Sequence, residues 1–202
     1  MTSHPLLIKF GVLTAFMLMA VRGSTTLDSA AAVQDEHTKA GQEFRLSVDE
    51  YLDLRIRAAL WLPIPDETRA SRLQMIQAHA AAVQIARETA RRGEIFTPAV
   101  SAMFRESVAA VLRQQGLTAA ALVRPFRDRY KMIKPPMVNE RFAWLRIAPM
   151  PEWLTDTLPV LPLELRYRLF DRDLVLFDYD LSLVVDILPD ALSAPPARSR
   201  SN

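Results

Sequence analysis

The spacing of apolar residues changes from helical to strand-like along this chain, and that change constrains the fold most. Before residue 125, apolar side chains recur every three or four residues, as on one face of an α-helix. After Pro162, apolar and polar side chains alternate over 165–169, and short, mainly apolar runs follow at 174–177 and 183–188. The sequence therefore predicts an α+β fold, in which three to four N-terminal helices pack with a C-terminal three-stranded antiparallel β-meander.

Start and stop signals divide the helical half of the chain. The expected first residues are polar side chains that can cap free backbone amides: Ser47 (with Glu50 in capping-box spacing), Asp66, Thr97 and Thr118. The expected ends are proline or glycine: Pro63, Gly93, Gly116 and Pro125. These signals predict three longer helices and one short one.

The apolar stripes of these helices are expected to face the core. In the first helix the stripe is Leu52, Ile56, Ala59 and Leu60, and in the second it is Leu73, Ile76, Ala80, Val83 and Arg87. In the third helix it is Val100, Met103, Phe104, Val108, Val111 and Leu112. Such stripes are typical of an ordinary core and do not indicate a cofactor site.

The expected organisation is one domain, residues 47–192, flanked by peripheral segments. Its helical part covers 47–124, a proline-rich extended connection covers 125–162, and the meander covers 163–192. The small, polar residues 24–46 are expected to form a flexible leader. The last residues, 193–202, are expected to be a disordered tail.

The beginning of the chain has the layout of a secretory signal peptide. A run of 12 apolar residues, 10–21, follows Lys9, so residues 1–23 are expected to be removed by cleavage after residue 23 or 32. Twelve helical residues reach about 18 Å, against a hydrocarbon core of about 30 Å. The sequence therefore predicts a periplasmic or secreted protein that meets the membrane only transiently. Retention of the segment as an N-terminal anchor is the alternative.

Composition excludes several classes of partner and cofactor. The chain has 25 basic and 23 acidic residues, and removal of Lys9 and Arg22 with residues 1–23 leaves 23 of each. A neutral mature chain does not favour nucleic acid. The chain has no cysteine, which removes disulfides and thiolate metal sites, and none of its five glycines follows Gly116, which leaves no glycine-rich phosphate loop. No cofactor and no metal are expected.

The two histidines of the mature chain do not indicate catalysis. His37 falls in the expected leader and His79 on the second helix, and no nucleophile motif accompanies either of them. A surface or boundary position is the expected one for His79, and no catalytic residue is assigned.

Acidic residues are concentrated around the predicted strands: Asp171, Asp173, Asp178, Asp180, Asp186 and Asp190. Most of them fall where strands reverse, so turn formation is the expected role. Asp186 differs because it interrupts an apolar strand, where alternation places it on one face with Val184. It is therefore a candidate buried acid paired with an arginine. A carboxylate-dependent hydrolase that uses Asp178, Asp180 or Asp186, or a cation bound by the acidic turns, is the alternative.

Basic residues are concentrated just upstream, in residues 124–146. That segment contains seven basic residues and only two acidic ones, Asp128 and Glu140, whereas residues 148–190 have a net charge of −6. The two segments are expected to neutralise each other within one fold. The alternative is an anionic cell-envelope component, a polymer or a lipid head group, bound by Arg124, Arg127, Arg129, Lys131 and Lys134.

Four stretches together resemble a family of uncharacterised bacterial exported proteins with a helical N-terminal half and a small C-terminal β-module. They are RGEIFTP (92–98), PMPEWL (149–154), RDLVLFD (172–178) and VVDILPDAL (184–192). The resemblance implies the same fold and an exported location, but it implies no activity and no site residue. Asp171 stands where glycine is expected in the first β-turn, which argues against a positive φ angle there.

These observations together favour a non-catalytic periplasmic binding or accessory module that acts on an unknown protein or envelope component. Such a module should have dispersed acids and an exposed apolar or aromatic patch. A hydrolase should instead bring two acids together in a pocket.

Overall fold

The structure is a computed structural model that describes residues 24–64, 66 and 68–193. The expected signal peptide, residues 1–23, and residues 194–202 of the expected tail lie outside the described residues. The chain divides into two units, residues 1–34 and residues 35–202, and the packing described below is that of the second unit.

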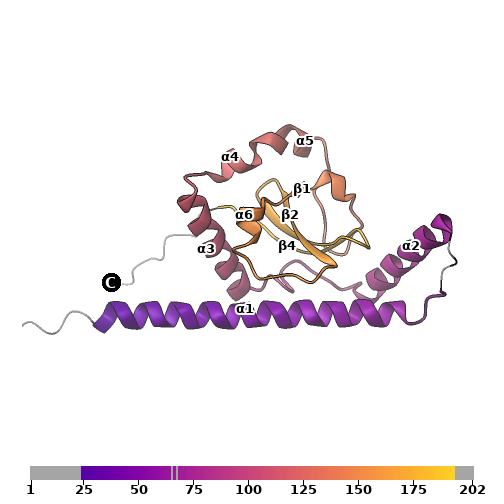
Figure 1. The fold of residues 1–202 in the computed structure, drawn as a ribbon, viewed down its shortest axis with the longest axis horizontal. Coiled ribbons are helices and arrows are strands. Elements are labelled where there is room, and N and C mark those ends of the chain that lie inside the picture. Colours follow the sequence, from indigo (N-terminus) through magenta and orange to yellow (C-terminus); the bar gives the residue numbers. More distant parts are fainter. Residues whose placement is uncertain (1–23, 65, 67, 194–202) are drawn as a thin grey trace, which may run out of the picture. The chain divides into compact units, whose positions relative to one another are not determined.

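The fold is α+β, with helices first and an antiparallel sheet last, which confirms the prediction (Figure 1). The longer helices are α1 (Ser24–Ala59), α2 (Arg69–Ala86) and α3 (Pro98–Gln114). The short helical elements are α4 (Ala119–Val123), η1 (Arg124–Phe126), α5 (Arg127–Lys131), η2 (Trp144–Arg146) and α6 (Glu152–Thr155). The strands are β1 (Ala148–Pro149), β2 (Leu165–Phe170), β3 (Asp173–Asp178) and β4 (Leu183–Leu188).

The sheet has the order β1-β2-β3-β4, so β2, β3 and β4 form the predicted meander and β1 adds a short edge strand. Helices α1 and α3 cover one face of it. The ring of Phe104 lies 5.0 Å from that of Phe44 in α1 and 5.7 Å from that of Tyr167 in β2, measured between centroids. This aromatic cluster lies in the core and joins the helical half to the sheet.

The proline-rich connection covers the opposite face and pairs with both edges of the sheet. The amide of Asn139 donates to the carbonyl of Val184 in β4, and Ala148 pairs with Leu169 in β2. Between these points, the ring of Phe142 packs at 6.3 Å against Phe170, which points to this face. The connection is therefore part of the sheet's hydrogen bonding and of its core.

The expectation of a flexible leader over 24–46 is wrong, because these residues form the first part of α1. Ala40 and Phe44 are buried in the core. The alanine-rich stretch 30–32 has high helix propensity, and the burial of Phe44 adds tertiary stabilisation that composition does not reveal. Ser47 consequently lies inside a helix and caps nothing.

The other helix starts follow the sequence more closely. Thr97 and Thr118 are the N-caps of α3 and α4, as predicted. Thr68, rather than Asp66, caps α2, since its hydroxyl accepts a bond from the amide of Ser71 while Asp66 accepts one from the amide of Thr68. The second helix ends at Ala86, before the predicted Gly93.

The turns between the strands, and the turn that follows β4, use polar residues in place of glycine. Asp171, Ser182 and Asp190 have φ angles of 51°, 55° and 49°. The expectation that Asp171 argues against a positive φ is therefore wrong. Aspartate and asparagine tolerate this left-handed conformation better than most residues, because their short polar side chains bond to the local backbone.

Candidate functional site

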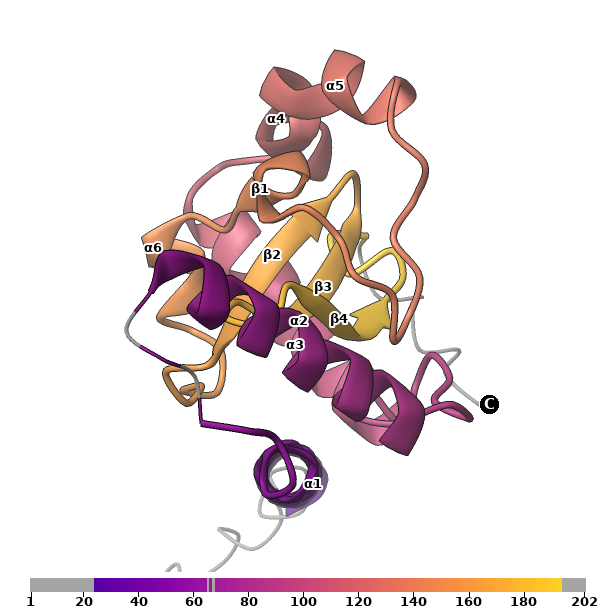
Figure 2. The same cartoon turned by 90° about the vertical axis from the view of Figure 1, so that its right-hand side faces the viewer.

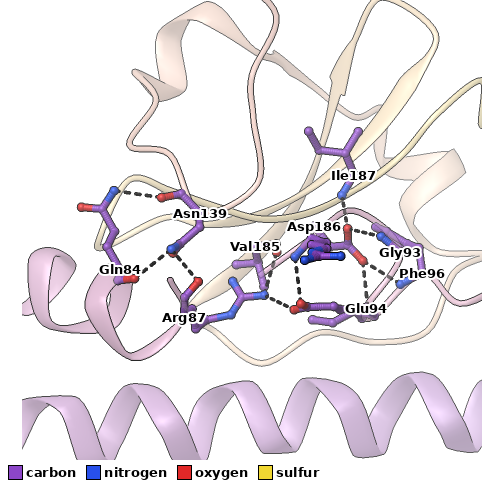
Figure 3. A network of polar contacts seen from close by, with 11 residues as sticks. Gln84, Arg87, Gly93, Glu94, Phe96, Asn139, Val185, Asp186 and Ile187 are labelled. Carbon is purple, nitrogen blue, oxygen red and sulfur yellow. Dashed lines mark hydrogen bonds and ion pairs between the residues drawn. The ribbon is translucent and has the colours of Figure 1, made fainter. Parts of the chain in front are cut away.

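Asp186 is fully buried and is the centre of a network between β4 and the loop that precedes α3 (Figure 3). Its carboxylate accepts hydrogen bonds of 2.7–2.9 Å from the backbone amides of Gly93, Ile95, Phe96 and Ile187. These donors replace the water that the carboxylate loses on burial. Asp186 therefore attaches the loop 93–96 to the sheet.

A β-bulge in β4 determines where Asp186 points. Asp186 lies opposite Leu176 in β3, but Val184 lies opposite the next residue, Phe177, so Val185 is an extra residue. Strict alternation placed Asp186 and Val184 on one face, and the bulge makes that expectation wrong. Asp186 instead faces the helices.

The expectation that Asp186 is buried is confirmed, but its donors are backbone amides, and no described arginine forms an ion pair with it. Arg87 is buried and donates to the carbonyl of Val185 at 3.1 Å and to the carboxylate of Glu94 at 3.2 Å. Its guanidinium carbon lies 5.2 Å from the ring centroid of Tyr51, a cation–π distance. Arg87 therefore joins the end of α2 to both β4 and α1.

A second network surrounds Asp178, which is also fully buried. The hydroxyl of Tyr51 donates to Asp178 at 2.8 Å, Nε of Arg55 at 2.9 Å, and the amide of Leu181 at 3.0 Å. The other end of Arg55 reaches the more exposed Asp180 at 3.1 Å. Burial, followed by the charge of Asp178, raises the pKa of Tyr51 well above its ordinary value, so this hydroxyl stays protonated.

The two networks use the acids that a hydrolase would need. Asp178 is held by an arginine, a tyrosine and an amide, and Asp186 by four amides. Among the described residues, no three His, Cys, Asp or Glu side chains come close enough to hold a metal ion. The geometry of these acids is that of structural connections between segments.

The remaining acids near the strands take part in turns. Asp173 accepts a bond from the amide of Asp190 at 2.9 Å, and burial raises the pKa of Asp173 above its usual value. Asp171 occupies the positive-φ turn between β2 and β3. These positions agree with turn chemistry.

A shallow pocket of about 320 Å3 lies beside α3 and is lined in part by His37, Ser107 and Asp156. His37, expected in a leader, lies on α1, and its Nε2 is 3.0 Å from a carboxylate oxygen of Glu106 without hydrogen-bond alignment. No hydrogen bond joins Ser107 to His37 within the described part of the chain, so the hydroxyl has no adjacent general base. The other histidine, His79, contacts the carbonyl of Arg55 at 2.9 Å.

Among the described side chains, no ion pair joins the basic residues of 124–146 to the acidic strands. Lys131 pairs with Asp128, and Lys134 pairs with Glu140, both within the basic segment itself. Asp178 and Asp180 pair with Arg55 in α1. The expected mutual neutralisation is therefore not made by ion pairs between the described side chains of the two segments, and Asp178, Asp180 and Asp186 are held instead by Arg55 of α1 and by backbone amides.

Four of the five residues proposed to hold an anion are exposed at the surface and form no ion pair with the described acids of the strands. Arg124 and Arg127 are exposed and form no ion pair among the described side chains, and Lys131 has only its local pair. Lys134 is exposed and pairs with Glu140. The side chain of Arg129 lies outside what the structure describes.

An exposed apolar patch, which the sequence analysis missed, lies at the end of α1. We call Ile56, Leu60, Trp61 and Ile64 the loop patch, and Trp61 and Ile64 are 91% and 96% exposed. Ile56 and Leu60 were predicted to face the core, as were Leu73 and Ile76 in α2, and all four are exposed. The helical period identifies a stripe but not whether another element covers it. The sequence feature that could have predicted this patch is Trp61, a large apolar residue at the expected end of the helix, directly before Leu62-Pro63.

No known protein family, curated protein or solved structure matches this chain. Within the described residues, no helix combines the length and the apolar character that crossing a membrane requires.

Proposed function

We propose that the protein is an exported, non-catalytic binding or accessory module that contacts a partner protein through the loop patch. The observation that carries this proposal is the exposure of Trp61 and Ile64, since large apolar side chains are rarely this exposed together without a binding role. Tryptophan is also the residue type most often found at the energetic centre of protein interfaces.

The loop that carries the patch is held in place at both ends. On one side, the amide of Leu62 donates to the carbonyl of Ala59. On the other, Asp66 accepts bonds from the amide and the hydroxyl of Thr68, which in turn caps α2. These bonds restrict described residues on both sides of Ile64, which lowers the conformational entropy that those residues lose on binding.

The surroundings of the loop patch indicate the chemistry of the partner. Arg57 lies beside Ile56 on α1, and Arg69 and Arg72 lie on the first turn of α2, all three exposed. Charged groups at the rim of an interface guide association and select partners. The partner expected here is a protein with an apolar cleft that is bordered by carboxylates.

A photo-crosslinking amino acid at position 61 tests the proposal in the envelope of the producing cells. Position 160 is the matched control, because Val160 is equally exposed at 92% but lies before β2. We expect position 61, but not position 160, to give an adduct of discrete mass with one protein. Binding of that protein, once purified, should weaken at least about tenfold with Trp61→Ala and remain unchanged with Val160→Ala.

Three results would contradict the proposal. An adduct of twice the mass of the chain would identify a second copy as the occupant, and a lipid adduct would identify a membrane. Equal crosslinking from both positions would show that the loop patch has no preferred partner.

A further inference from the structure

A basic surface lies at the opposite end of the β2–β3 hairpin from the loop patch. In the helical run from α4 to α5, Val123, Phe126 and Tyr130 face inward, and the hydroxyl of Tyr130 donates to the carbonyl of Leu169 in β2. Arg124, Arg127 and Lys131 follow these residues by one position each. They therefore share a neighbouring, solvent-facing side of the same run.

Arg146 extends this surface from η2. The ring of Phe170 packs against Tyr130 of α5 at 4.7 Å and against Phe142, just before η2, at 6.3 Å. Both segments therefore meet at one end of the sheet, and Figure 2 shows α4 and α5 there, separated from α2. We call Arg124, Arg127, Lys131 and Arg146 the basic face.

Three of the four charges of the basic face are not neutralised by any described side chain. Asp128 pairs with Lys131 at 3.1 Å, but Arg124, Arg127 and Arg146 have no acidic partner among the described side chains. Asp178, Asp180 and Asp186, which could have balanced them, are held by Arg55 and by backbone amides. A cluster of unneutralised arginines attracts an anionic surface.

Exposed apolar residues accompany these charges. Met132 directly follows Lys131 and is 88% exposed, and Leu145 directly precedes Arg146 and is 67% exposed. A soluble polyanion offers nothing to such side chains, whereas a lipid surface offers head groups to the arginines and acyl chains to the apolar residues.

We propose that the basic face binds the surface of a membrane that contains anionic phospholipid, with Met132 and Leu145 entering the region below the head groups. This binding is peripheral and separate from the contact made by the loop patch. It also differs from any role of residues 10–21, whose apolar character gives no preference for lipid charge.

The test measures binding of the full chain to vesicles of phosphatidylcholine, with and without phosphatidylglycerol, at low and high salt. The difference between the two lipid mixtures isolates the electrostatic contribution, because residues 10–21 contribute equally to both. We expect tighter binding to the anionic vesicles, and a loss of that preference at high salt.

Two double variants with the same change in net charge locate the effect. We expect Arg124→Gln with Arg127→Gln to weaken binding to anionic vesicles by roughly thirtyfold at low salt. The control, Arg57→Gln with Arg72→Gln, removes two exposed arginines near the loop patch and should change binding less than about threefold. Equal losses in both pairs would overturn the proposal, as would the absence of any preference for anionic vesicles.

A third double variant separates a membrane from a soluble anion. Met132→Ser with Leu145→Ser should weaken vesicle binding severalfold and leave binding of inorganic polyphosphate unchanged. Vesicle binding that is unaffected by these substitutions would show that the basic face recognises charge alone, and would overturn the assignment to a lipid surface.

Discussion

Two buried carboxylates, Asp178 and Asp186, connect segments that are far apart in the sequence. Asp178 in β3 holds Tyr51 and Arg55 of α1, and Asp186 in β4 holds the loop 93–96. A carboxylate suits this role because its two oxygens can accept several hydrogen bonds at once. Removing such a group leaves several buried donors without an acceptor, which costs more than the loss of one hydrogen bond.

Replacing Asp186 should therefore destabilise the fold strongly. Asp186→Asn puts an amide nitrogen among backbone N–H donors, and we expect it to lower the free energy of unfolding by about 3 kcal/mol. Asp190→Asn is the matched control, because Asp190 is exposed and asparagine also tolerates its φ angle of 49°. Urea denaturation measures both variants, and a loss below about 1 kcal/mol for Asp186→Asn would contradict the role of this network.

Tyr51 gives the fold a sensitivity to alkaline pH. Burial raises its pKa in the folded state, whereas the unfolded chain releases the phenol proton near pH 10. Above that pH the folded state binds more protons than the unfolded state, so stability falls as pH rises, by up to about 1.4 kcal/mol per pH unit for this group. Tyr167 is shifted in the same direction by its burial.

The variant Tyr51→Phe isolates this contribution. At neutral pH it should be less stable by about 1–2 kcal/mol, because buried Asp178 loses a donor. Above pH 10 its stability should fall less steeply than that of the wild type, so the two curves converge. Urea denaturation at a series of pH values measures this, and parallel curves would show that Tyr51 ionises equally in both states.

Among the elements, the connection between α5 and β1 depends on Asn139. Its side-chain amide donates to the carbonyls of Gln84 and Arg87 at the end of α2, and its φ angle is 63°. In return, the side chain of Gln84 donates to the carbonyl of Asn139. One residue thus joins the end of a helix to the edge of the sheet at β4.

Two substitutions at Asn139 separate the side-chain bonds from the backbone strain. Asn139→Gly loses the bonds but accepts the positive φ, whereas Asn139→Ala loses the bonds and adds strain. We expect losses of about 1–2 kcal/mol for glycine and about 1 kcal/mol more for alanine, measured by thermal unfolding. Equal losses for the two variants would indicate that the φ angle relaxes.

The elements predicted best from sequence are those with a local cause. Thr97-Pro98 places a cap and a preset φ angle at the start of α3, and the alternation in β2 and the short apolar runs of β3 and β4 are visible within a few residues. Two errors are local, namely the cap of α2, which is Thr68 rather than Asp66, and the positive φ angle of Asp171. The other errors concern long-range contacts. Local spacing does not encode which distant segment packs on a given surface. Such packing determines the exposure of Ile56, the partners of Asp186 and the pairing of residues 139–142 with β4.

In the molecule as a whole, charge is arranged differently from what the sequence suggests. Composition balances the basic segment 124–146 against the acidic residues after 148. In the fold, α1 supplies the arginine that satisfies Asp178 and Asp180, so the basic face keeps its charge. Because residues 35–59 belong to a helix that contacts the sheet, Arg55 can pair with these acids, and the surface proposed to bind lipid remains positively charged.

The contribution of α1 to the fold can be tested by shortening the chain. The buried residues begin at Ala40 and Phe44, and Phe44 contacts Phe96, Phe104 and Tyr167. A chain that begins at residue 35 keeps these contacts and should unfold at nearly the same urea concentration as the full chain. A chain that begins at residue 47 loses them and should be at least about 3–5 kcal/mol less stable, since removing one buried phenylalanine ring alone costs that much.

The substitution Phe44→Ala in the full chain is the control for the effect of shortening itself. It should reproduce most of the loss seen in the chain that begins at residue 47, because the deleted buried contacts centre on this ring. If the chain from residue 47 were as stable as the chain from residue 35, residues 35–46 would be dispensable to the core. That result would restore the interpretation of this segment as a flexible leader.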